Sequence, residues 1–121
     1  MSIEKYDEYF VVNMKSVRNL LKNEVPGVQV LYDVLCEEMC FYTFRQARGQ
    51  FVSIAVDAQK KMLEEESGLA WRTIRRYLAI LIKKGLIRKK GEDILQINPE
   101  FAYKGEGSQR AAACRQWYDT A

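Results

Sequence analysis

The fold is decided by residues 57–97, which read DAQKKMLEEESGLAWRTIRRYLAILIKKGLIRKKGEDILQI. Asp57 is suited to cap a helix, and Ser67-Gly68 and Gly85 are suited to end one. After the second of these breaks, the residues on either side of Gly91 predict a hairpin. The predicted elements are two helices and two strands, over residues 57–66, 70–84, 86–90 and 94–97. Helix, glycine turn, helix and hairpin form the order of a winged helix-turn-helix, which is mainly α-helical with a small β-hairpin wing.

The rest of the chain is predicted to add helices and short strands around this unit. Pro26-Gly27 separates two upstream helices, because proline disfavours helix in the residue before it and suits a first turn. The second of these helices is apolar over a wide arc and should lie at the centre of the core. Phe101 and Tyr103 should pack back on that core after Asn98-Pro99 closes the hairpin. The predicted elements are a strand over 9–13, helices over 14–23 and 28–42, a loop over 43–50, a strand over 51–56 and a helix over 108–118.

The composition is that of a folded protein with one core. The chain has 121 residues, of which 48% are hydrophobic and 29% charged, so disorder is excluded. We predict a winged-helix domain over residues 1–106, followed by a C-terminal helical extension over 107–121. No apolar run approaches the ~18 residues of a membrane span, and the N-terminus begins with charged residues rather than with a signal peptide. The sequence therefore predicts a cytoplasmic protein that does not bind membranes.

Histidine is missing from the sequence, which excludes several classes of enzyme and metal site. An imidazole base, a histidine-containing zinc site and the HExxH protease motif all require that residue. The three cysteines lack the CxxC pairs of a zinc ribbon, and Cys36 and Cys40 are predicted to share one face of a buried helix. We therefore predict no catalytic residue, no cofactor and no metal, and a protein that is not an enzyme.

The net charge of +3 is distributed unevenly along the chain. Residues 1–40 hold four basic and seven acidic side chains and carry −3, which leaves +6 on the remainder. Residues 71–90 contain eight cations and no acid. These cations are Arg72, Arg75, Arg76, Lys83, Lys84, Arg88, Lys89 and Lys90. Such a cluster favours an anionic partner, most often a nucleic acid, although a solvated helix face is the simpler alternative.

The predicted helix over 70–84 separates its apolar side chains from its cations. On a helical wheel Leu78 and Leu81 fall within about 40° of Ile74, and most of the arginines fall on the opposite side. Trp71 falls near the apolar stripe and should pack rather than contact bases. A helix with two such faces can dock on its own domain while it presents donors to phosphates and base edges. Together with the wing, the predicted contacts to double-stranded DNA are Arg72, Thr73, Arg75, Arg76, Lys83, Arg88, Lys89 and Lys90.

The residues from Phe51 to Gly105 resemble the RepL family of firmicute plasmid replication proteins. The resemblance rests on a strand before the two helices, on Gly85-Leu86-Ile87 before the wing, and on Ile97-Asn98-Pro99 followed by Lys104-Gly105 after it. The likeness covers most of residues 9–110. It implies a winged-helix protein that binds the origin of a plasmid or phage element and takes part in starting or maintaining its replication. The positions that the resemblance carries over are Arg72, Thr73, Arg75, Arg76, Arg88 and Lys89.

Two other functions fit the same residues. A transcriptional repressor of winged-helix type would make the same contacts to DNA, at a promoter rather than at an origin. A phage-borne winged-helix inhibitor would instead dock on a host replication or nucleic-acid-processing protein. A homodimer is a further expectation, since winged helices often pair to match two half-sites. Its predicted contacts are Leu20, Leu21, Trp117 and Tyr118.

Overall fold

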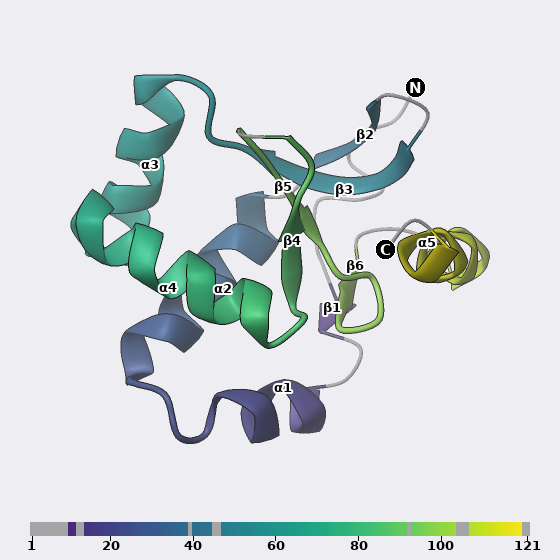
Figure 1. Cartoon of the computed structure of the whole chain (residues 1–121), viewed down its shortest axis with the longest axis horizontal. Coiled ribbons are helices and arrows are strands. Elements are labelled where there is room, and N and C mark those ends of the chain that lie inside the picture. Colours follow the sequence, from purple (N-terminus) through teal and green to yellow (C-terminus); the bar gives the residue numbers. More distant parts are fainter. Residues whose placement is uncertain are drawn as a thin grey trace.

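The computed structural model describes residues 10–11, 14–38, 40–44, 47–91, 93–103 and 107–119. These residues form five helices and six strands, so this part is mainly helical with a small antiparallel sheet, compatible with a winged helix (Figure 1). The helices are α1 (Met14–Leu21), α2 (Pro26–Glu38), α3 (Asp57–Ser67), α4 (Trp71–Lys83) and α5 (Gly107–Asp119). The strands are β1 (Phe10–Val11), β2 (Cys40–Phe44), β3 (Ala47–Ser53), β4 (Ile87–Lys89), β5 (Ile94–Ile97) and β6 (Ala102–Tyr103). None of the helices in the described ranges has the length and apolar character needed to cross a bilayer.

Four of the strands form one antiparallel sheet in the order β2-β3-β5-β4. β4 and β5 pair as the predicted wing hairpin, with Lys89 opposite Leu95. β1 and β6 form a separate pair, which confirms the predicted N-terminal strand at residues 10–11; the rest of the predicted range, 9 and 12–13, lies outside the described residues. In Figure 1 the four-stranded sheet lies between α2, α3 and α4 on one side and α5 on the other.

The structure corrects the prediction for the segment that follows α2. The helix predicted over 28–42 ends at Glu38. The range predicted as a loop, 43–50, contains the end of β2 and the start of β3, and residues 45–46 lie outside the described residues. Of the strand predicted over 51–56, residues 51–53 are the end of β3, and residues 54–56 lie between β3 and α3. β2 pairs with β3 along its whole length, and β3 pairs in turn with β5. Residues 40–44 read CFYTF, which is aromatic and β-prone, and their cross-strand partners override the helical spacing that continues from α2.

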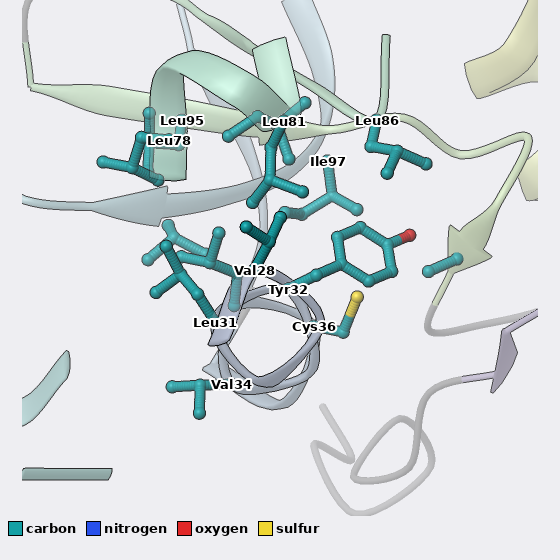
Figure 2. Packing of buried hydrophobic residues seen from close by; sticks show 14 of the residues in the cluster. Val28, Leu31, Tyr32, Val34, Cys36, Leu78, Leu81, Leu86, Leu95 and Ile97 are labelled. Atoms are coloured by element: carbon teal, nitrogen blue, oxygen red, sulfur yellow. The ribbon is translucent and has the colours of Figure 1, made fainter. Parts of the chain in front are cut away.

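α2 is the centre of the hydrophobic core, as its apolar arc predicts. Val28 and Leu31 are fully buried, and Leu81 of α4 meets them across the core (Figure 2). Each buried leucine of this kind contributes about 1.5–3 kcal/mol to stability. Cys36 is buried on α2, as predicted, but Cys40 lies in β2. The two cysteines therefore do not share a helix face.

α3 begins without the predicted cap. Asp57 is its first helical residue and is exposed, and the capping position is Val56. Gln59 supplies the acceptor instead, since its Oε1 accepts hydrogen bonds from the backbone N–H groups of Ala55 (3.0 Å) and Val56 (3.2 Å). The Ser53 hydroxyl donates to the same oxygen at 2.9 Å. A glutamine at the third helical position that reaches back in this way is one half of a capping box, and here it ties the end of β3 to the start of α3.

The end of α4 has the geometry of a glycine cap, as predicted. Gly85 has a φ of +79°. Its N–H donates to the Ile82 carbonyl at 3.0 Å, and the Leu86 N–H donates to the Leu81 carbonyl at 3.1 Å. These two bonds form a Schellman motif, in which the residue after the cap is left-handed. The motif turns the chain directly from α4 into the wing.

Replacement of Gly85 by alanine is expected to lower the free energy of unfolding by about 1 kcal/mol, because a Cβ is disfavoured at this φ. No heavy atom lies within 4 Å of the position that the Cβ would take, so the cost is backbone strain rather than collision. Gly85→Asn should cost less, since asparagine tolerates the left-handed region better than alanine does. Urea unfolding of the three proteins measures these differences. An alanine variant as stable as the wild type would contradict the prediction.

The second face of the sheet is covered by α5, which confirms the helix predicted over 108–118. Ala113 and Trp117 of this helix are buried, and so are Phe51 and Gln96 on the sheet. Phe51 and Gln96 lie directly opposite each other on β3 and β5, so their side chains share one face. The predicted division of the chain into a domain and an extension stays a prediction.

Two of the four side chains predicted to form a homodimer are used inside the chain. Leu21 and Trp117 are 6% and 8% exposed, and Leu20 packs on the core from a half-buried position. Tyr118 is 57% exposed, and its hydroxyl donates a hydrogen bond to the Glu100 carboxylate. The structure therefore does not offer Leu21 and Trp117 as dimer contacts, and the homodimer itself stays a prediction.

Candidate nucleic-acid interface

α4 turns its cations away from the core, as the helical wheel predicts. Ile74, Leu78 and Leu81 are buried on the core side, and Thr73 is half-buried beside them. The exposed side chains of the opposite face are Arg72, Arg75, Arg76, Ala79 and Lys83. None of these four cations forms an ion pair or a hydrogen bond with any residue that the structure describes. Their donors are therefore open to a partner.

A groove of about 380 Å³ runs between α4 and the wing. Its lining is both apolar and polar. Three cations enter it from three elements, Lys60 from α3, Arg75 from α4 and Lys89 from β4, and one carboxylate, that of Asp93, lies among them. We call it the α4–wing groove, and its lining residues are Ile54, Lys60, Trp71, Arg75, Leu78, Ala79, Ile82, Lys89 and Asp93. The lining cations outnumber the carboxylate, and a concave site with a net positive charge focuses its potential on a ligand of the opposite sign. The α4–wing groove thus suits an anion.

A second hollow, of about 440 Å³, lies over the first two turns of α4. It is lined by Trp71, Arg72, Arg75 and Arg76. Trp71 and Arg75 line both hollows. The arginines of α4 and the lysines of the α4–wing groove therefore belong to one continuous surface.

Trp71 fixes the start of α4 against α3. Its backbone N–H donates to Glu64 Oε2 at 3.0 Å, which satisfies one of the unpaired N–H groups at the helix start. Its ring is half-buried and packs on the core, as predicted, and the Lys60 ammonium lies 5.5 Å from the ring centroid. This cation–π contact holds Lys60 beside the groove. Lys60 is a candidate that the sequence did not reveal, because nothing distinguishes it from Lys61 until α3 and α4 are packed.

The wing cations do not all face the same way. Side chains alternate along a strand, so Lys89 shares a face with Ile87, whose side chain is buried in the core. Lys89 accordingly lines the α4–wing groove. Arg88 lies between them and points to the opposite face of the sheet, toward α5.

Arg88 is bound by side-chain and main-chain groups of the protein itself. Its Nε donates to Gln96 Oε1 at 2.9 Å, and its Nη1 donates to the backbone carbonyl of Trp117 at 2.8 Å. Its guanidinium carbon lies 4.0 Å from the centroid of the Trp117 ring. Burial lowers the pKa of Arg88, and burial together with the neighbouring charge of Arg88 lowers the pKa of Lys90. Two donor groups of Arg88 are thus engaged within the chain, and its contact to DNA stays a prediction. Lys90 lies near Arg88 and is not among the residues that line the groove.

Lys84 forms a partly exposed ion pair with Glu24 at 3.7 Å, which links the end of α4 to the segment between α1 and α2. Such exposed pairs contribute at most about 1 kcal/mol.

Within the described residues, no three His, Cys, Asp or Glu side chains are grouped so that they could hold a metal ion.

A comparison with protein-family models shows to which family the chain belongs. The family model described as Firmicute plasmid replication protein (RepL) matches residues 40–120. The chain belongs to the RepL family. The RepL match runs from β2 through α5, so it includes α4, the wing and the helix that covers the sheet. No curated protein and no solved structure matches the chain significantly.

In this RepL chain the motif Ile97-Asn98-Pro99 closes the wing onto the end of α4. Asn98 is 3% exposed, and its Nδ2 donates to the Gly85 carbonyl at 2.8 Å. Its backbone N–H donates to the Leu86 carbonyl at 2.9 Å, and its Oδ1 accepts the Glu100 N–H at 3.0 Å. One buried side chain thus joins the end of β5 to the cap of α4. The junction fixes the point at which the wing leaves the end of α4.

Proposed function

We propose that this RepL protein is a winged-helix protein that binds double-stranded DNA at the replication origin of a plasmid or phage element. α4 is the recognition helix and enters the major groove, which is ~12 Å wide and admits one helix. The observation that carries the proposal is the exposure of Arg72, Arg75 and Arg76 on the first two turns of α4, without ion pairs to the described residues. Arginine is the commonest donor to guanine O6 and N7 and also binds phosphates.

The α4–wing groove supports a second set of contacts. A helix that lies in the major groove has a sugar–phosphate strand along each side. Lys60 and Lys89 approach one such strand from α3 and from the wing. Lys83 lies near the end of α4 and suits a backbone phosphate, and Thr73 can donate to a phosphate or contact a thymine methyl group. We assign no DNA contact to Arg88, and Lys90 remains a candidate for a peripheral phosphate.

The proposed role is binding without catalysis, in the cytoplasm, where a plasmid origin resides. The absence of histidine from the sequence supports it, because the commonest general base in proteins is missing. The family description supports a part in replication, and the exposed cations support DNA as the partner.

Duplex binding should depend steeply on salt. If about five cations meet phosphates, the logarithm of the binding constant should fall against the logarithm of salt concentration with a slope of about −4.5. Fluorescence anisotropy titrations with a labelled duplex at several salt concentrations measure the slope. A slope near zero, or no duplex binding at low salt, would contradict the proposal.

Selection from a random duplex pool with the purified protein tests binding and sequence preference together. Footprinting of the enriched sequence on the replicon then separates the candidate functions. Protection of an origin repeat supports the proposal, whereas protection of a promoter would indicate a repressor. Failure to bind any duplex, combined with a tight complex with a purified host replication enzyme, would indicate an inhibitor.

A further inference from the structure

α5 is bonded to the segment that follows the wing. Arg110 donates to the backbone carbonyls of Pro99 (2.8 Å) and Glu100 (2.9 Å). The Tyr118 hydroxyl donates to the Glu100 carboxylate. These bonds hold α5 near both of its ends to the loop between β5 and β6. The helix therefore occupies a fixed place on the sheet.

Arg88 bonds α5 to the wing as well. It lies on β4 directly opposite Gln96 of β5, and its bond to that side chain spans the two wing strands. Gln96 is 1% exposed, so the bridge is shielded from water on one side. The Trp117 carbonyl that accepts from Arg88 lies in the last turn of α5. Carbonyls of a last turn lack helical partners and carry a partial negative charge, so they favour a cation.

We propose that Arg88 is a positioning residue for DNA binding: by fixing the wing to α5 it sets the adjacent Lys89 over the α4–wing groove. The inference rests on the proposed function. Because side chains alternate along β4, a rotation of the strand that frees Arg88 from α5 also turns Lys89 away from the groove. Arg88 thus acts on DNA through Lys89.

Arg88→Lys separates positioning from charge. Lysine keeps the positive charge but lacks the planar fork and stacking face with which Arg88 binds Gln96 and Trp117. We expect faster amide hydrogen exchange over residues 87–97 in the free protein. We also expect binding to the selected duplex to weaken about threefold to tenfold, the range of a coupled contact.

The matched control is Arg110→Lys. This variant also removes an arginine that bonds backbone carbonyls between α5 and the rest of the chain, but its contacts lie outside the wing strands. Hydrogen exchange over residues 87–97 and duplex affinity should both stay close to the wild type. An Arg110→Lys variant with the same wing exchange and the same loss of affinity as Arg88→Lys would overturn the specific role of Arg88.

A double-mutant cycle with Lys89→Ala tests whether Arg88 acts on DNA through Lys89. If Arg88 acts through Lys89, then Arg88→Lys causes no further loss of affinity once Lys89 is alanine. Additive losses would overturn the inference, because Arg88 would then contact DNA by itself. Unchanged wing exchange in Arg88→Lys, or a rise that extends equally over α2 and α4, would also overturn it, whether or not DNA binds. If exchange rises in the wing as expected but even the wild type binds no duplex, the proposed function fails while the link between α5 and the wing is supported.

Discussion

Replacement of Arg72, Arg75 and Arg76 together by glutamine is expected to weaken binding to the selected duplex about 100-fold or more, since each arginine contact to DNA contributes about 1–3 kcal/mol. The three side chains are exposed and glutamine is a good helix former, so the stability of the fold should be unchanged. The salt dependence should also become shallower, because fewer phosphates are neutralised. Anisotropy titrations of the variant at several salt concentrations, beside a thermal unfolding curve, measure all three quantities.

The matched control replaces three cations of the N-terminal helix region. Lys15, Arg18 and Lys22 are also exposed, and their replacement by glutamine changes the net charge by the same amount. They do not line the α4–wing groove. The control should therefore bind only slightly less tightly, through the loss of long-range attraction. Equal losses in the two triple variants would contradict a recognition role for α4, because net charge alone would then set the affinity.

The helices and the wing could be predicted because their signals are local. Gly68 and Gly85 have φ values of +73° and +79°, which glycine adopts more readily than other residues, and each ends a helix where the sequence places the break. The apolar spacing of α4 then fixes which side is buried, and with it the exposed position of the arginines. For this part of the molecule, a residue's near neighbours in the sequence decide its environment.

The hairpin of β2 and β3 could not be predicted in the same way. Met39 and Tyr42 continue the apolar spacing of α2, and no glycine or proline interrupts the chain before β2. What ends α2 is pairing with distant residues, since β3 joins β5 far along the chain, with Phe51 opposite Gln96. Strand preference depends on such partners more than helix preference does. A single sequence does not identify them.

The orientation of the wing side chains could be predicted from the sequence, but their neighbours could not. Once Ile87 is placed in the core, alternation along the strand sends Lys89 to the same face and Arg88 to the other, so their separation could have been derived. The sequence does not show that α5 covers that other face, because this depends on the path of the chain after β6. The position of Lys60 at the groove likewise depends on the packing of α3 against α4.

Asn98→Asp is expected to lower the free energy of unfolding at neutral pH by about 3 kcal/mol, because a buried carboxylate cannot donate to the carbonyl that Asn98 now binds. That carbonyl belongs to Gly85, and the bond joins the wing to the cap of α4. Burial beside a carbonyl raises the pKa of the new carboxyl above its ordinary value of about 3.9. The folded state then binds the proton more tightly than the unfolded state does. Stability relative to the wild type should therefore fall as pH rises from about 4 through the raised pKa.

Asn98→Ala is the control, since it removes the same donor without adding a titratable group. It should cost about 1–3 kcal/mol relative to the wild type, by an amount that does not change between acid and neutral pH. Urea unfolding of the wild type and both variants across that range measures the difference. If the aspartate variant is less stable than the wild type by an amount that does not depend on pH, the buried bond between Asn98 and Gly85 is contradicted. Because this bond also sets the spacing of α4 and the wing, the alanine variant should bind the selected duplex more weakly even where it is fully folded.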